Sequence, residues 1–231
     1  VLDTIDECMK NHPRNDHRTV IVHFANSDEA QVARIARLGA IVSANPYYPC
    51  GFADKYGEVG LGPERADVMT RNRSVVDHGI PLSFHSDLPM GPSEPLGMMA
   101  HAVNRITQSG RVAAPEQRID AEAALRAVTI EAAYSWRREH ELGSIAPGKY
   151  ATFTVVDRDP LEVDPLELGD IEVIGTVFEG RWFPVADGAG SVTALTGGAT
   201  ALHSPTVGGA GHDHDGCSCA VARALVAALA A

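Results

Sequence analysis

The sequence lacks the features that mark membrane-spanning, secreted or nucleic-acid-binding proteins. No apolar run approaches the roughly 20 residues that a membrane-spanning helix needs. The first residues do not follow the basic-then-apolar order of a signal peptide. With 19 Lys and Arg against 30 Asp and Glu the formal net charge is −11, which disfavours the basic patches that nucleic acid or an anionic membrane requires. We therefore expect no nucleic-acid partner and no membrane partner.

Cysteine is also scarce. The four cysteines among 231 residues are Cys8, Cys50, Cys217 and Cys219, too few and too scattered for a disulfide framework. This usage predicts free thiols in a reducing compartment, and we expect a cytoplasmic protein. The hydrophobic content of 45% and the charged content of 21% are those of an ordinary globular chain.

Three short apolar segments rich in β-branched residues predict strands buried on both faces, at residues 19–24, 40–45 and 81–90. Apolar residues at helical spacing predict helices at residues 1–12, 26–38, 63–78, 96–109 and 119–138. Residues 47–63 carry four aromatic side chains and are predicted to form a long functional loop. Alternating strands and helices indicate right-handed parallel α/β units, and periodicity leaves an open sheet and a barrel both possible.

Beyond Gly143 the pattern changes to short β segments at residues 150–156, 171–174 and 175–183. Glu179-Gly180 lies between two of these apolar stretches, which predicts a hairpin. A small antiparallel sheet is therefore expected after the α/β part.

Polar side chains stand at the ends of the three predicted parallel strands. In an extended strand, alternate residues share a face. On this basis Ile21 shares a face with His23, and Ser43 shares one with Asn45. In the third strand, Ser83, His85 and Asp87 share a face. An imidazole and a carboxylate would then converge at the carboxyl ends of the strands, a pair that suits zinc. The alternative for a single strand histidine is a hydrogen-bonded core residue.

Several motifs together resemble the amidohydrolase superfamily, and in particular the amidohydrolase-3 group related to the YtcJ and AepA proteins. The similarity covers about residues 1–185 and rests on His23-Phe-Ala-Asn, Ser43-Ala-Asn-Pro-Tyr-Tyr48, Phe84-His-Ser-Asp-Leu-Pro-Met90, Ala124-Leu-Arg-Ala-Val-Thr129, Gly143-Ser-Ile-Ala-Pro-Gly-Lys149 and Gly175-Thr-Val-Phe-Glu-Gly180. The resemblance implies strands 6–8 of a (β/α)8 TIM-like barrel, followed by strands of a small β-sandwich. It also implies that residues 1–140 belong to the barrel and residues 141–185 to the sandwich. Residues 186–231, outside the resemblance, are expected from their composition to form a Gly/Ala-rich linker, a His/Cys motif and a short helix.

The same resemblance assigns roles to individual residues. His23 matches the family's strand-6 metal ligand, and Asp87 matches the strand-8 aspartate that holds the metal and shuttles protons. The implied cofactor is a divalent metal, with zinc expected as one or two ions. His85 is a candidate for orienting Asp87, or fills the barrel core. Asn45, Tyr47, Tyr48 and Arg65 are substrate-side candidates because they lie at or after the end of strand 7, with loop packing or surface charge as the alternative.

Members of this superfamily carry further ligands on strands 1–5, including a His-x-His pair, and none precedes His23 here. We therefore expect the chain to be a C-terminal portion that needs an N-terminal portion of the same enzyme, as a separate chain or a further segment. The expected function is metal-dependent hydrolysis of carbon–nitrogen bonds other than peptide bonds, in small amides or cyclic amides. The alternative is a non-catalytic structural or regulatory subunit or fragment that needs a partner to complete the metal site.

The C-terminal region has its own motif. His212-Asp-His-Asp-Gly-Cys-Ser-Cys219 combines imidazoles, carboxylates and thiols that could bind a soft metal, although Gly-rich surroundings would not preorganise them. A metal-handling function centred on this tail is a third hypothesis, and adventitious binding is its alternative. The apolar segment 221–229 predicts a short helix that docks on a partner or subunit, so we expect an oligomer.

Overall fold

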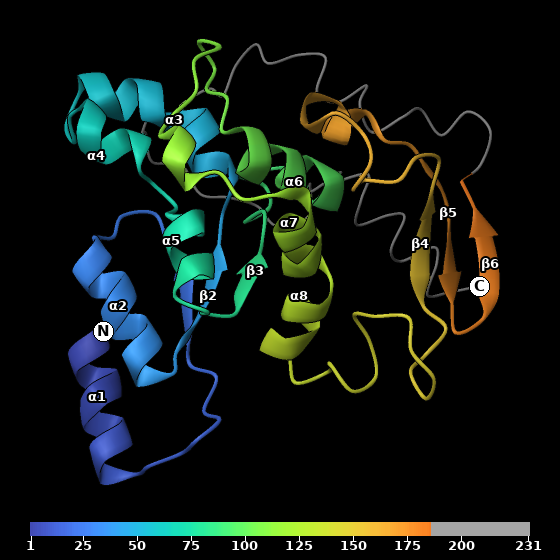
Figure 1. The fold of residues 1–231 in the computed structure, drawn as a ribbon, viewed down its shortest axis with the longest axis horizontal. Coiled ribbons are helices and arrows are strands. Elements are labelled where there is room, and N and C mark those ends of the chain that lie inside the picture. Colours follow the sequence, from blue (N-terminus) through green and yellow to red (C-terminus); the bar gives the residue numbers. More distant parts are fainter. Residues whose placement is uncertain (186–231) are drawn as a thin grey trace, which may run out of the picture. The chain divides into compact units, whose positions relative to one another are not determined.

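The computed structural model describes residues 1–185, where three parallel strands form one sheet and three antiparallel strands form another. The parallel strands are β1 (Val20–His23), β2 (Ile41–Ala44) and β3 (Leu82–Phe84), in the order β1-β2-β3 (Figure 1). The expected α/β class with parallel strands is therefore confirmed. The predictions for residues 186–231, including the His/Cys motif and the terminal helix, lie outside the described residues.

The helices begin and end at local signals. Within residues 1–185 the α-helices are α1 (Leu2–Asn11), α2 (Glu29–Leu38), α3 (Tyr47–Glu58), α4 (Pro63–Asp67), α5 (Asn72–Asp77), α6 (Pro95–Asn104), α7 (Ala121–Val128) and α8 (Ile130–Ser135), with 3-10 turns η1 (Pro115–Gln117) and η2 (Pro165–Asp170). Asp28 caps α2 in a reciprocal capping box with Gln31, and Gly39 ends that helix in the left-handed conformation. Asp120 caps α7 by accepting a hydrogen bond from the backbone N–H of Ala123. In the described part of the chain, no helix combines the length and apolar character needed to cross a membrane.

The predicted loop at residues 47–63 is wrong over most of its length, because residues Tyr47–Glu58 form α3. Pro46 stands at the N-cap and Pro49 falls in the first turn. Proline is tolerated in the first turn, since the N–H groups there have no partner within the helix. The prolines therefore open the helix rather than prevent it.

Two predicted helices are each divided in the structure. The segment expected at residues 63–78 forms α4 and α5, separated around Thr70, which has a left-handed backbone with φ of 48°. The segment expected at residues 119–138 forms α7 and α8, separated at Thr129, whose hydroxyl donates to the carbonyl of Leu125. In both cases contacts made at the junction replace the continuous helical bonds that the periodicity predicted.

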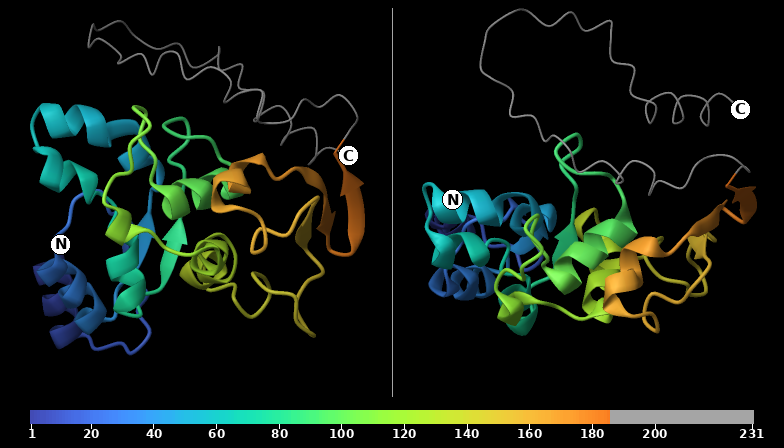
Figure 2. Two further views of the ribbon diagram at one scale, coloured as in Figure 1. Left: turned by 45° about the horizontal axis from the view of Figure 1, so that its top comes forward. Right: turned by 90° about the horizontal axis from the view of Figure 1, so that it is seen from above.

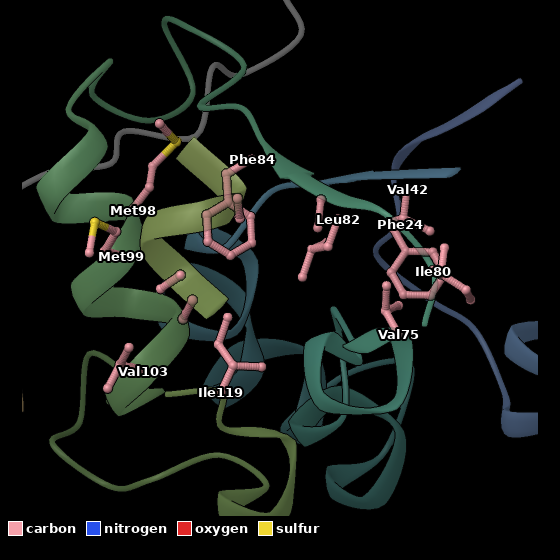
Figure 3. Close-up of a cluster of buried hydrophobic side chains, with 14 of the residues drawn as sticks. Phe24, Val42, Val75, Ile80, Leu82, Phe84, Met98, Met99, Val103 and Ile119 are labelled. Carbon is pink, nitrogen blue, oxygen red and sulfur yellow. The ribbon is translucent and has the colours of Figure 1, made fainter. Parts of the chain in front are cut away.

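One face of the parallel sheet packs on the helices. In the register, Ile21 pairs with Val42, which pairs with Leu82, and Ala44 pairs with Phe84. These side chains belong to one hydrophobic core, which also includes Met98, Met99, Val103 and Ile119 (Figure 3). Helices α5, α7 and α8 contact β3, and η2 lies beside α6 (Figure 2). The opposite face carries Ser43 paired with Ser83.

The second sheet contains β4 (Phe153–Val156), β5 (Val173–Phe178) and β6 (Arg181–Pro184), all antiparallel. The predicted hairpin at Glu179-Gly180 is confirmed, with both residues at positive φ. Many of its apolar side chains are exposed, and Trp182 retains 45% of its accessible surface. Trp136, which follows α8, is 81% exposed.

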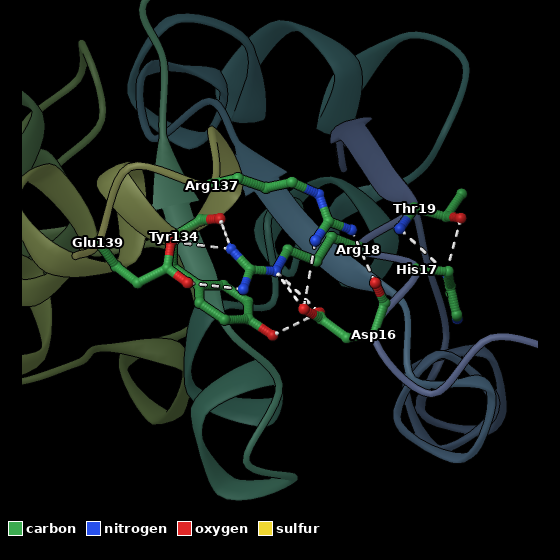
Figure 4. Close-up of polar contacts among 7 residues, drawn as sticks. All are labelled: Asp16, His17, Arg18, Thr19, Tyr134, Arg137 and Glu139. Carbon is green, nitrogen blue, oxygen red and sulfur yellow. Dashed lines mark hydrogen bonds and ion pairs between the residues drawn. The ribbon is translucent and has the colours of Figure 1, made fainter. Parts of the chain in front are cut away.

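An ionic cluster joins the segment before β1 to the end of α8 (Figure 4). The Arg18 guanidinium donates two hydrogen bonds to the Glu139 carboxylate, at 2.9 and 2.6 Å, and one to the backbone carbonyl of Tyr134 at 2.7 Å. It also lies 3.7 Å from the centre of the Tyr134 ring. Asp16 accepts further hydrogen bonds from Arg18 and Arg137. The cluster ties residues more than 100 positions apart.

This cluster predicts an acid-sensitive contribution to stability. The Arg18 hydrogen bonds hold the pKa of Glu139 at about 2, below its ordinary value of 4.5. Between those two values the unfolded chain binds the additional proton, so the contribution is complete above pH 4.5 and is lost as the pH falls toward 2. We expect at most about 1–2 kcal/mol, because the pair is partly solvent-exposed. Urea unfolding of Glu139→Gln and the parent from pH 6 to pH 3 should show a smaller loss in the variant, and equal pH dependence would contradict this.

Candidate active site

Three candidate residues meet at the carboxyl ends of the parallel strands. The Nδ1 atom of His23 lies 3.1 Å from Nε2 of His85 and 3.8 Å from Oδ2 of Asp87. The other His85 ring nitrogen, Nδ1, lies 2.9 Å from the Ser43 hydroxyl oxygen. The structure therefore places His23, His85 and Asp87 together, and Ser43 joins them.

The route by which His23 reaches this position differs from the prediction. In the register His23 pairs with Ala44, whose side chain lies in the core, rather than with Ser43 on the opposite face. Continued extended backbone would therefore place the imidazole on the helix-covered face. Instead, His23 has a left-handed backbone with φ of 67°, and its imidazole contacts His85. The predicted common face for Ile21 and His23 is wrong for this reason.

Asp87 also has an unusual backbone, with φ of 55°. Left-handed conformations in residues other than glycine cost free energy and occur preferentially at functional sites. The side chains of His23 and Asp87 are 47% and 45% exposed, so both remain accessible to a ligand. Two residues with left-handed backbone, one at the end of β1 and one after β3, thus present an imidazole and a carboxylate to the same space.

The electrostatic surroundings affect the neighbouring groups. Burial lowers the pKa of His85, and the adjacent His23 lowers it further, while Asp87 acts in the opposite direction. Burial raises the pKa of Tyr48, with a smaller contribution from Asp87. The Tyr48 ring centre lies 6.3 Å from that of His23. Tyr48 therefore flanks the cluster as a neutral phenol.

The structure separates the remaining candidates. Asn45 is fully buried and Tyr47 nearly so. The Asn45 side chain donates a hydrogen bond to the backbone carbonyl of Ser86, and the Tyr47 hydroxyl donates one to the backbone carbonyl of Pro92. Arg65 is exposed on α4, and within residues 1–185 no hydrogen bond or ion pair joins it to His23 or Asp87. The burial of Asn45 and Tyr47 favours packing over direct substrate contact.

The donor set partly suits a divalent metal. Two zinc ligands at about 2.1 Å in tetrahedral geometry lie about 3.4 Å apart, and the His23 and Asp87 atoms are 3.8 Å apart. In the described residues, however, no three His, Cys, Asp or Glu side chains are gathered so that they could hold a metal ion. The site supplies suitable ligands but not enough of them.

A model of the amidohydrolase family matches residues 1–183. The N-substituted formamide deformylase of Arthrobacter pascens is 34% identical over 185 residues, which cover 78% of this chain and 33% of that protein. A Bacillus subtilis protein named "Putative amidohydrolase YtcJ" is 27% identical over 186 residues, which cover 78% of this chain and 34% of that protein.

A solved structure, an uncharacterized metal-dependent hydrolase from Pyrococcus furiosus, aligns with a TM-score of 0.56 and 27% identity, over 70% of this chain and 32% of that one. The chain spans about a third of the length of the curated relatives that it matches. The match of the family model to most of the sequence agrees with the motifs around His23 and Asp87. The chain belongs to the amidohydrolase family.

Proposed function

We propose that this chain contributes to the active site of a metal-dependent hydrolase that cleaves carbon–nitrogen bonds other than peptide bonds. The proposed substrates are small amides or cyclic amides. The observation that supports this most directly is the convergence of His23, His85 and Asp87 at the carboxyl ends of β1 and β3, the two outer strands of the parallel sheet. In parallel α/β folds such strand ends are where catalytic side chains gather. Membership of the amidohydrolase family supports the same reaction class.

In this proposal His23 and Asp87 hold a divalent metal, for which zinc is the expected ion, as one or two ions. When bound, the metal supplies Lewis acidity, polarising a carbonyl and lowering the pKa of a water. The Asp87 carboxylate takes a proton from the attacking water as the water oxygen adds to the carbonyl carbon of the substrate. Asp87 then gives that proton to the leaving nitrogen as the carbon–nitrogen bond breaks. His85, whose Nδ1 lies 2.9 Å from the Ser43 hydroxyl oxygen, packs edge-on against the His23 ring with 5.0 Å between ring centres and so supports the position of that ring.

The remaining metal ligands are proposed to come from an N-terminal portion of the same enzyme, as a further segment or a separate chain. Catalytic zinc sites usually use three protein ligands, and residues 1–185 do not gather three. In this arrangement β1, β2 and β3 serve as strands 6–8 of a barrel, and β4, β5 and β6 contribute to a β-sandwich. The three-part division at residues 140 and 185, the oligomeric state and the cytoplasmic location stay predictions.

The donor count also favours a second candidate function. A chain without three gathered ligands could be a structural or regulatory subunit whose metal site exists only with a partner. The two functions differ in what the assembled protein does rather than in the fold of this chain. Metal binding and turnover in the assembly therefore distinguish them.

Zinc binding should depend on the assembly and on His23. We expect the chain alone to hold zinc weakly, and its complex with the N-terminal portion to hold it tightly, as measured by elemental analysis and competition titration. His23→Ala should weaken zinc binding by the assembly by about 10–100-fold or more, since even residues that only support ligands contribute that much. His140→Ala is the matched control, because its side chain is 68% exposed beside Glu141. Equal zinc affinity in His23→Ala and the parent would contradict the proposed site.

A further inference from the structure

We propose that Asn45 and Tyr47 are positioning residues that together fix the segment 86–92, and with it the carboxylate of Asp87. The inference deepens the proposed function and rests on Asp87 being its acid–base group. It concerns contacts within the described chain, so part of its test is independent of activity.

Asn45 fixes the beginning of the segment. Its side-chain N–H donates to the backbone carbonyl of Ser86 at 3.2 Å, and its Oδ1 accepts from the backbone N–H of Tyr47 at 3.0 Å. Asn45 is 0% exposed, so neither bond competes with water. The amide thereby joins the residue before Asp87 to the start of α3.

Tyr47 fixes the other end. Its hydroxyl donates to the backbone carbonyl of Pro92 at 3.0 Å, and its ring packs edge-on against His101 with 4.8 Å between ring centres. The ring also covers Gly91, where an added Cβ would lie 2.5 Å from Cδ2 of Tyr47. Burial raises the pKa of Tyr47, followed by the effect of Glu94, so the phenol remains a protonated donor. One buried side chain therefore holds the far end of the segment by a bond and by contact.

Asp87 lies between these two anchors, in a turn in which its backbone carbonyl accepts a hydrogen bond from the N–H of Met90 at 2.7 Å. Its carboxylate is 45% exposed, and its 3.8 Å separation from His23 is longer than a hydrogen bond. Its left-handed backbone persists only where the surrounding structure determines it. Asn45 and Tyr47 bond to the carbonyls on either side, Ser86 and Pro92, and so supply that constraint.

The test uses the assembled enzyme with Tyr47→Phe, which removes only the hydroxyl, and Gly91→Ala, which displaces the ring. Hydrogen–deuterium exchange should be about three- to tenfold faster in the peptide covering residues 86–92, because a buried hydrogen bond is lost. Peptides covering β2 should exchange as in the parent. Turnover should fall by about tenfold or more through kcat, with KM little changed, because misplaced catalytic groups affect the reacting geometry.

Tyr150→Phe is the control, since this tyrosine is 50% exposed and lies outside the segment 86–92 and its two anchors, Asn45 and Tyr47. If exchange in residues 86–92 and kcat both match the parent in Tyr47→Phe and Gly91→Ala, the inference is overturned. If the variants exchange faster only in residues 86–92, and the parent itself does not hydrolyse amides, the result would support the positioning role and reject the proposed function. Faster exchange with unchanged kcat in an active parent would overturn the positioning role.

Discussion

The Asp87→Asn variant of the assembled, metal-loaded enzyme is expected to lose about 10²–10⁴-fold in kcat, the usual contribution of a positioned acid–base group. Asparagine keeps the shape of the side chain and can still offer an oxygen to a metal. It cannot accept the proton of the attacking water or deliver it to the leaving nitrogen. The exposed carboxylate at the end of β3, beside His23, is placed for both transfers.

Zinc content must be measured in the same samples, because Asp87 is also a proposed ligand. A large loss of kcat with zinc retained assigns proton transfer to Asp87. If kcat and zinc content fall together, the main role of Asp87 is to bind the metal. Asp77→Asn is the matched control, since Asp77 ends α5 and makes an exposed ion pair with Arg73. Unchanged turnover in a metal-loaded Asp87→Asn enzyme would remove Asp87 as the base.

The Arg105→Met variant is expected to be destabilised by about 3–5 kcal/mol, because four hydrogen bonds from a buried guanidinium to backbone carbonyls are lost at about 1 kcal/mol or more each. Arg105 is 1% exposed. Its guanidinium donates to the carbonyls of Asp67, Met69, Thr70 and Ala113 at 2.7–3.0 Å. Burial lowers its pKa to about 10, which leaves it charged at neutral pH. Methionine would fill much of the volume but remove all four of these hydrogen bonds, and the carbonyls of Met69 and Thr70 would keep only the bonds that they accept from the Thr70 hydroxyl and the Asn72 N–H.

Urea unfolding followed by circular dichroism measures this loss. Arg118→Met is the control, because Arg118 makes a single exposed hydrogen bond to the carbonyl of Asn104 and should cost less than about 1 kcal/mol. An Arg105→Met variant within about 1 kcal/mol of the parent would show that water or other donors replace the guanidinium.

Arg105 also explains why sequence periodicity could not place the helices fully. The carbonyls that it binds, at Asp67, Met69 and Thr70, lie where a single helix was predicted to continue. A side chain 35 or more positions away therefore ends α4, and no local pattern carries that information. The three parallel strands were predictable from their short runs of apolar, β-branched residues. The expected burial on both faces is wrong for β1, where Val22 is 53% exposed. Helix α3 was missed because proline usually interrupts a helix. Pro46 and Pro49 are compatible with α3 because they lie at its N-cap and in its first turn.

The candidate site was predictable in composition but less so in geometry. His23 and Asp87 stand at strand ends, which the apolar segments before them reveal. Their orientation depends on left-handed backbone at both residues, and alternation of side chains holds only while a strand stays extended. The burial of Asn45 follows from bonds to Ser86 and Tyr47, which the sequence spacing does not show.

The exposure of both tryptophans has a spectroscopic consequence. Trp136 and Trp182, the only two in the chain, are 81% and 45% exposed in the folded structure. Their indoles already contact water, so fluorescence emission should resemble that of a solvated indole before unfolding begins. Denaturation should then change the emission wavelength little, even when the core around β3 is lost. The same property makes an introduced tryptophan useful: one placed in that core would emit at shorter wavelength, distinct from the two native residues.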